Sequence, residues 1–134
     1  LTEEGLLYTW GGADKGQLGH GDDARQLSPM VVEALRGKKC RRVSCGMHHS
    51  MCLTDSGDVY TWGSGEYGRL GHDDEQMQAT PTLLEALINK GVSDVSAGGF
   101  HSLAVSRLGA SNRRGGETAY AARRTGRQRF VASA

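Results

Sequence analysis

The chain has 134 residues, room for one ordinary domain, and its net charge is only +1. That balance hides an asymmetry, because residues 1–106 hold 9 basic and 14 acidic side chains whereas residues 107–134 hold seven arginines and one glutamate. The sequence therefore excludes a uniformly basic nucleic-acid-binding surface, and it shows no apolar run that could span a bilayer and no signal peptide. We expect an intracellular protein, cytoplasmic or nuclear.

The sequence repeats itself after 52 residues. Without any gap, 23 of 52 positions are identical between the two copies. Periods of about 20–50 residues are typical of solenoids and propellers. We interpret residues 1–52 and 53–104 as two copies of one repeat, and we expect a third to begin at about residue 105 and break off.

The expected elements of each copy are short strands, described here for the second copy. Residues 57–63 are β-branched and aromatic between glycines, which predicts a strand, and a glycine-rich loop follows over 63–74. Residues 80–87 predict an edge strand with Pro81 near its start, and a helical turn over 83–89 is the alternative.

Two further strands complete the copy. Residues 92–97 are apolar and β-rich, and residues 101–106 are mostly apolar, as in a strand buried on both faces. Four short strands in about fifty residues match one propeller blade. The predicted fold class is all-β, with two structurally equivalent four-stranded antiparallel units.

The repeat pattern fails after Gly109. Asn112 and Arg114 stand where the next strand should supply tyrosine and tryptophan, and residues 110–134 are poor in branched aliphatic side chains. We expect residues 110–134 to be a disordered, basic tail without regular structure. The start at Leu1 suggests a fragment or a processed chain, and the tail is either genuine or the product of an altered reading frame or alternative exon.

The positions that recur in both copies form a signature. They are Tyr8, Trp10, Gly11, Gly16, Leu18, Gly19, His20, Gly46, His49 and Ser50 in the first copy, and Tyr60, Trp62, Gly63, Gly68, Leu70, Gly71, His72, Gly98, His101 and Ser102 in the second. This signature resembles the repeat of the regulator-of-chromosome-condensation family over about residues 1–109. The resemblance implies two blades of a β-propeller that is usually seven-bladed in that family. The segments 33–37 and 68–72 look somewhat more like the propellers of large HECT-type ubiquitin ligases than like the other propellers of the family.

The tryptophans and cysteines are interpreted as packing residues. Trp10 and Trp62 are expected in the core, because each blade needs one such residue. Cys40, Cys45 and Cys52 align with valine or alanine in the second copy, which is how packing positions behave. We expect free thiols, no disulfide, no metal and no cofactor.

The histidines suggest chemistry at first sight. His49 and His101 each precede a serine, as in a hydrolase pair, but nucleophilic catalysis also needs an orienting acid and an oxyanion hole at one unique place. We expect instead imidazole-to-backbone hydrogen bonds that tie each blade to a turn. His48 aligns with Phe100, which we interpret as a space-filling exchange.

Three other motifs are weaker. The glycine loop over 11–16 superficially resembles a phosphate cradle but lacks a following helix. The acidic run 73–75 is either simply solvated or a rim that attracts a basic partner. The arginines of 113–114 and 122–129 have few aromatic neighbours, so nucleic-acid binding is not favoured.

The function that fits best is a non-catalytic protein-interaction module whose loops bind a protein partner. The alternatives are nucleotide exchange on a Ran-like small GTPase, which the absence of loop insertions disfavours, and the partner-binding propeller of a HECT-type ligase. Two blades leave an apolar face bare at each end. We therefore expect the isolated chain to be marginally folded, to aggregate, or to self-associate into a ring of three or four chains.

Overall fold

The computed structural model describes residues 1–107 and the backbone of residues 117–121. It is all-β, as predicted. The strands are β1 (Tyr8–Gly11), β2 (Gln26–Val31), β3 (Cys40–Cys45), β4 (His49–Thr54), β5 (Val59–Gly63), β6 (Gln78–Leu83), β7 (Val92–Ala97), β8 (Ser102–Arg107) and β9 (Glu117–Ala121). Three short 3-10 turns join them: η1 (Glu33–Leu35), η2 (Glu66–Gly68) and η3 (Glu85–Leu87). Among these described residues, no helix has the length and apolar character needed to cross a membrane.

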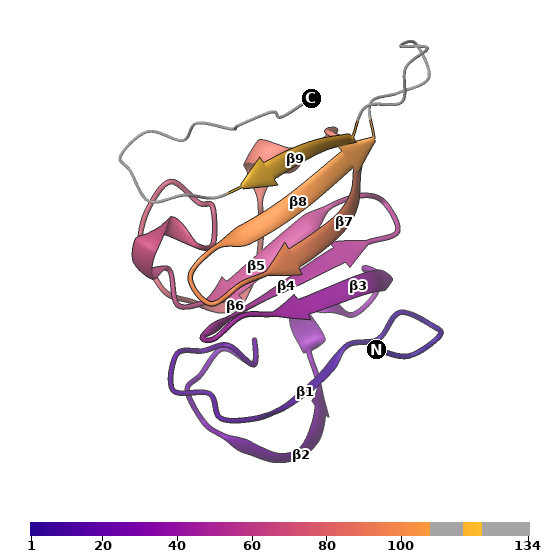
Figure 1. Cartoon of the computed structure of the whole chain (residues 1–134). Coiled ribbons are helices and arrows are strands. Elements are labelled where there is room, and N and C mark those ends of the chain that lie inside the picture. The colour runs from indigo at the N-terminus through magenta and orange to yellow at the C-terminus, as the bar shows by residue number, and fades with distance from the viewer. Residues whose placement is uncertain (108–116, 122–134) are drawn as a thin grey trace.

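The strands form three antiparallel sheets. Sheet A is β1-β2, sheet B is β3-β4-β5-β6 and sheet C is β7-β8-β9. Figure 1 shows the three as successive layers with sheet B in the middle. This arrangement gives sheet B a neighbour on both faces, whereas sheets A and C each have one.

Sheet B is a complete four-stranded blade, and it takes its strands from both repeats. Strands β3 and β4 end the first repeat, and β5 and β6 begin the second. The prediction of one four-stranded unit per repeat is therefore wrong. A tight turn over 55–58 joins β4 to β5, with a hydrogen bond from Thr54 N to Asp58 O at 3.0 Å. The boundary between the copies, after residue 52, lies near the end of β4 just before this turn, so the blade straddles it.

The strand predictions agree well with the structure. Strand β7 covers the expected residues 92–97, and β5 lies inside the expected 57–63. The two alternatives for 80–89 both occur in succession, since β6 is followed directly by the turn η3. β6 pairs with no strand other than β5 and is an edge of sheet B, where Pro81 is tolerated.

Two apolar cores hold the layers together. The core between sheets A and B consists of Leu7, Val32, Leu35, Cys40, Cys52 and Trp62. The core between sheets B and C consists of Met51, Leu53, Val59, Leu84, Leu87, Val92, Val95 and Ala104. β4 contributes alternate side chains to both cores, so all six of its residues are buried. Its equivalent β8 alternates between buried and more exposed residues, so the prediction that 101–106 is buried on both faces is wrong.

The backbone repeats even where the side chains do not. Gly37 has φ of +82° and its counterpart Asn89 has +59°. At the next such position the order is reversed, with Lys39 at +49° and Gly91 at +64°. The left-handed conformation is thus required by the turn itself, and each copy tolerates a non-glycine residue at one of the two sites.

Strand β9 departs from the expectation that residues 110–134 have no regular structure. Its five residues pair antiparallel with β8, from Glu117 opposite Arg107 to Ala121 opposite Leu103. The free edge of β8 offers backbone donors and acceptors, and a short segment can pair there without aliphatic side chains. The rest of the predicted tail lies outside the described residues.

Candidate functional site

The two equivalent tryptophans occupy different environments. Trp62 is 1% exposed, and its Nε1 donates to Gln17 O of the preceding layer at 2.9 Å. A Cβ on Gly19 would lie 2.8 Å from that nitrogen, so glycine lets the indole approach. Trp10 is 59% exposed. The core prediction is therefore correct for Trp62 and wrong for Trp10, because the face of sheet A that carries Trp10 has no layer packed on it in the described residues.

A threonine and a histidine fasten the long loop of each repeat. Thr61 Oγ1 donates to Leu70 O at 2.8 Å and therefore accepts from His72 Nε2, also at 2.8 Å. Thr9 and His20 make the same contact at 2.9 Å in the first repeat. The imidazoles of His20 and His72 thus reach the backbone through a hydroxyl group.

His49 makes a similar relay between sheets B and C. Its Nε2 lies 2.8 Å from Ser102 Oγ, which donates to Arg69 O at 2.7 Å. The adjacent Ser50 points to the other face of β4 and donates to Gln17 O at 2.8 Å. The serine that follows His49 in sequence is therefore not its partner.

The His49–Ser102 contact does not have the features of a catalytic pair. Burial, followed by the positive charge of Arg69, lowers the pKa of His49 to about 4, so the imidazole is neutral at pH 7. Ser102 uses its proton in the bond to Arg69 O. Within the described residues, His49 Nδ1 has no hydrogen-bond partner, so no acid orients the ring as in a triad. The arrangement is architectural.

The buried histidine predicts acid sensitivity. Its pKa is about 4 when folded against an ordinary 6.5, so between these values the unfolded chain binds more protons. The free energy of unfolding should fall as pH drops through that window, by at most about 1.4 kcal/mol per pH unit. Urea titrations of the chain and of His49→Gln across this range would check it. The variant should show the shallower dependence, and equal slopes would contradict the prediction.

Gly46 and Gly98 stand three residues before His49 and His101 and shape the turn in front of each histidine. Gly46 N donates to His49 O at 2.8 Å and Gly98 N donates to His101 O at 2.9 Å. A Cβ on either glycine would overlap the imidazole that folds back over the turn. This overlap explains why the two residue types recur at fixed spacing in the signature.

The most distinctive cluster surrounds Arg69 in the β5–β6 loop. Its side chain is fully buried, and its Nε donates to Glu66 O at 2.8 Å. The guanidinium carbon lies 5.6 Å from the Tyr67 ring centroid and 5.2 Å from that of Phe100. The two rings meet edge to face at 5.6 Å. Cation–π and aromatic contacts therefore fix both rings on one guanidinium.

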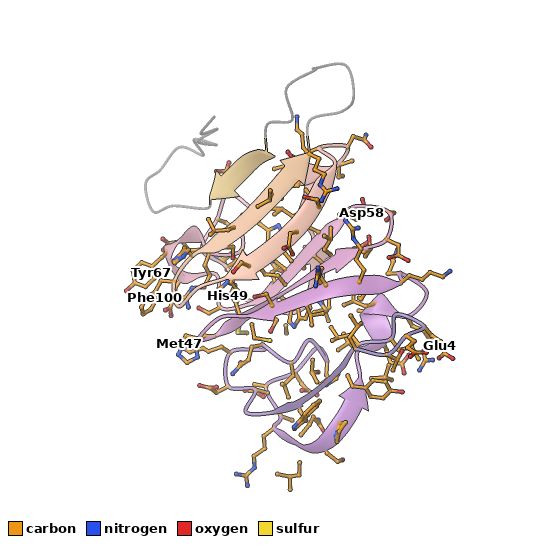
Figure 2. The ribbon with its side chains drawn as sticks, turned by 45° about the vertical axis from the view of Figure 1, so that its right-hand side comes forward. Glu4, Met47, His49, Asp58, Tyr67 and Phe100 are labelled. Atoms are coloured by element: carbon orange, nitrogen blue, oxygen red, sulfur yellow. The ribbon has the colours of Figure 1, made fainter. Side chains whose placement is uncertain are left out.

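The outer surface of this cluster is apolar and exposed. Phe100 is 53% exposed, Tyr67 39% and Met47 58%, although they come from three different loops. Figure 2 shows all three at the same side of the molecule, with Glu4 and Asp58 at the opposite side. We call Met47, Tyr67 and Phe100 the loop face. Tyr67 also has φ of +62°, a strained conformation for a non-glycine residue and one that functional loops often contain.

Sequence reasoning missed this cluster and misjudged Phe100, which is exposed rather than space-filling. The signal lay in the positions where the copies differ. Tyr67, Arg69 and Phe100 replace Lys15, Gln17 and His48 of the first repeat. In a repeat protein the shared residues build the blade, so differences concentrated in loops mark the surface that is free to specialise.

The other candidate residues do not gather into a site. All three cysteines are free, with Cys40 and Cys52 buried and Cys45 exposed. A hydrogen bond with Cys40, together with burial, raises the pKa of Cys52, which stays a thiol. Among the described residues, no three His, Cys, Asp or Glu side chains lie close enough to hold a metal. The acidic residues 73–75 are exposed in the β5–β6 loop, and the arginines of 113–114 and 122–129 lie outside the described residues.

Comparison with protein families identifies the repeat. The family model for the regulator of chromosome condensation (RCC1) repeat matches residues 4–53 and again 56–105. Human E3 ubiquitin-protein ligase HERC2 is 48% identical over 98 residues, which are 73% of this chain and 2% of that protein. The Arabidopsis thaliana ultraviolet-B receptor UVR8 is 40% identical over 109 residues, which are 81% of this chain and 25% of the receptor. The chain thus spans at most a quarter of either relative.

Solved structures show the same fold. Human WBSCR16 matches with a TM-score of 0.74 at 23% identity, over 90% of this chain and 29% of that one. Prp20p of Saccharomyces cerevisiae matches with a TM-score of 0.69 at 23% identity, over 90% of this chain and 30% of that one. Both likenesses support the arrangement of sheets as propeller blades.

Proposed function

Because the chain belongs to the regulator of chromosome condensation (RCC1) repeat family, we propose that it is a non-catalytic protein-interaction module that binds a protein partner through the loop face. The observation that carries this proposal is the set of three exposed apolar side chains, Met47, Tyr67 and Phe100, supported by buried Arg69. Large apolar side chains on a rigid support are typical of binding hot spots. Three free thiols fit a cytoplasmic or nuclear location.

The support for the loop face is physical as well as comparative. The two rings are held by Arg69 before any partner arrives, which reduces the entropy lost on binding. The same β5–β6 loop carries the exposed acidic residues 73–75, which would attract a basic partner toward the apolar centre. The fold relative Prp20p binds Gsp1p and histones, and it has also been crystallised with Kap60, so propellers of this type do bind proteins.

The proposed role of this chain does not include catalysis. HERC2 is a ubiquitin-protein ligase, but the similarity covers 2% of it. Among the described residues, His49 is neutral at pH 7 and Ser102 already donates its proton to Arg69 O, so this pair does not form an activated nucleophile. We propose that the chain contributes partner recognition to whatever activity a larger protein has.

The test compares partner capture by matched variants. The full chain, the double variant Met47→Ser/Phe100→Ser and the control Leu27→Ser would be used as bait. Leu27 is 89% exposed but lies on β2, outside the loop face. Proteins retained by the unaltered chain would be identified by mass spectrometry and their dissociation constants measured.

We expect the loop-face variant to bind at least about tenfold more weakly and the Leu27→Ser control to bind normally. Circular dichroism should show all three folded alike, because the substituted side chains are exposed. Partner binding that survives the loop-face substitutions unchanged would refute this site.

A further inference from the structure

The β5–β6 loop carries only negative charge on its outer surface. Residues 64–77 include Glu66 and the acidic residues 73–75, and all four carboxylates are exposed. The loop contains one Lys or Arg side chain, Arg69, which is fully buried and donates to Glu66 O at 2.8 Å. The corresponding loop of the first repeat, 12–25, mixes three acidic with two basic side chains. The surface beside the loop face is therefore distinctly acidic in the second repeat.

Two residues of this loop also differ from their counterparts in backbone conformation. Asp73 has φ of +65° at a position where the first repeat has Gly21 at +90°. Tyr67 has φ of +62°, whereas its counterpart Lys15 does not have a positive φ. Left-handed backbone is unfavourable for both side chains, although aspartate tolerates it better than most. The loop thus holds a carboxylate and an aromatic ring in strained positions, which is typical of binding loops.

A basic segment of the same chain begins close to this surface. β9 ends at Ala121, which pairs with Leu103 near the start of β8. Leu103 is three positions after Phe100 of the loop face, so the two lie at most about 10 Å apart along the chain. Figure 1 shows the arrowhead of β9 directed toward the side of the molecule that carries the β5–β6 loop. The sequence after Ala121 therefore continues from a point next to the loop face.

The residues that follow match the chemistry of this surface. Residues 122–130, called here the arginine segment, contain four arginines and Phe130 but no acidic side chain. A guanidinium group pairs with carboxylates through two hydrogen bonds and stacks on aromatic rings. The loop face and the neighbouring residues 73–75 offer both kinds of partner. We propose that the arginine segment binds the loop face of its own chain and competes there with the protein partner, a role that rests on the function proposed above.

Tethering makes a weak contact sufficient. A short connection supplies an effective concentration of about millimolar, so even a contact of millimolar affinity is occupied much of the time. The positions from Ala121 to Phe130 can span up to about 30 Å, which is enough to cross the loop face. Ion pairs at an exposed surface are individually weak, so a partner that binds more tightly displaces the segment. The contact acts as an internal competitor that raises the affinity a partner needs.

A spin label tests the contact directly. In a Cys45→Ser background, a nitroxide on Ser133→Cys labels the chain selectively, because Cys40 and Cys52 are buried. We expect it to broaden the amide resonances of the β5–β6 loop and of the 98–101 loop. The amide of Asp58, which lies at the opposite side of the molecule in Figure 2, should stay sharp.

A mixed sample separates a contact within one chain from a contact between chains. Isotope-labelled chain without nitroxide is mixed with nitroxide-labelled chain that carries no isotope. The mixture should show no broadening, because the segment that binds belongs to the observed chain. Broadening in the mixture equal to that in the doubly labelled chain, or no broadening at the loop face in either sample, would overturn the proposal.

Matched charge variants test the complementarity. Asp73→Asn/Asp74→Asn/Glu75→Gln removes three carboxylates while asparagine keeps the tolerance for positive φ and the side-chain oxygen that accepts from Gln76 N at 2.9 Å. This variant should lose most of the broadening at the loop face. The control Glu3→Gln/Glu4→Gln/Asp55→Asn changes the net charge equally and should keep it. Equal broadening in the two variants would reject the acidic residues as the binding surface.

A peptide in trans tests the competition. The probe is a synthetic peptide of residues 122–134, and the receptor is the full chain with all four arginines of the segment changed to glutamine. We expect this receptor to bind the peptide at least about tenfold more tightly than the unaltered chain, whose own segment occupies the surface. The same peptide with four glutamines should not bind. No binding to the altered receptor, or equal affinity for both receptors, would contradict the proposal.

These outcomes are separable from those for the proposed function. The spin label and the peptide involve no partner, so the internal contact can be present or absent whichever protein is captured. With a captured partner, the four-glutamine chain should bind at least about tenfold more tightly than the unaltered chain. Unchanged partner affinity would refute the competition even if the internal contact exists. Partner binding at the loop face without any broadening would refute the internal contact and leave the proposed function intact.

Discussion

Trp62→Ala should lower the free energy of unfolding by about 3–5 kcal/mol, the range found when a large buried aromatic side chain is truncated. Trp62 is 1% exposed and belongs to the core between sheets A and B, so its removal leaves a cavity that the rigid blade cannot fill. The hydrogen bond to Gln17 O is also lost, at about 1 kcal/mol.

The matched control is Trp10→Ala, which changes the same residue in the same local sequence. Trp10 is 59% exposed, so its loss should lower the free energy of unfolding by less than about 1 kcal/mol. Both variants would be unfolded in urea at a concentration where the chain is monomeric. Equal losses would mean that the two repeats have equivalent environments, contrary to the layered structure.

Gly63→Ala should destabilise the chain by about 3 kcal/mol or more, because it combines backbone strain with overpacking. Gly63 has φ of +103°, and an added Cβ would lie 2.5 Å from His48 O and 2.8 Å from His49 Cα. His49 is the register partner of Gly63 in the central pair of strands, so the clash can be relieved only by separating β4 from β5.

Gly11→Ala separates the two effects. Gly11 has nearly the same backbone angle, φ of +106°, but nothing lies within 4 Å of an added Cβ. Only the strain of a left-handed alanine remains, about 1 kcal/mol. Urea unfolding of the two variants measures the difference. If Gly11→Ala were as harmful as Gly63→Ala, strain alone would explain both and the close contact between β4 and β5 would be discounted.

The repeat and most strand positions could be predicted because they depend on local pattern. Glycines at fixed spacing, the β-rich run at 92–97 and the recurring Tyr-Thr-Trp-Gly segment report on the backbone of one repeat. The position of the blade could not be read in the same way. Which strands share a sheet depends on pairing across the repeat boundary, and the turn over 55–58 decides this rather than the strands themselves.

The environment of Trp10 was mispredicted for a related reason. Its neighbours in sequence are those of Trp62, but burial depends on a preceding layer that the repeat pattern does not supply. The cluster of Arg69 with Tyr67 and Phe100 was missed because it joins loops of different sheets. Residues 30 or more apart meet there only once the sheets have stacked.

The claim on which the rest depends is that each blade packs against the layer before it, which protects its tryptophan from solvent. Exchange of the two indole N–H protons, followed by nuclear magnetic resonance at a concentration where the chain is monomeric, tests this most directly. Trp62 Nε1 is buried and donates to Gln17 O, whereas Trp10 is largely exposed. We predict that the Trp62 proton exchanges far more slowly, at a rate governed by unfolding, and that the Trp10 proton exchanges nearly as fast as in an unfolded chain. Similar rates for both indoles, or slower exchange at Trp10, would contradict the layered arrangement.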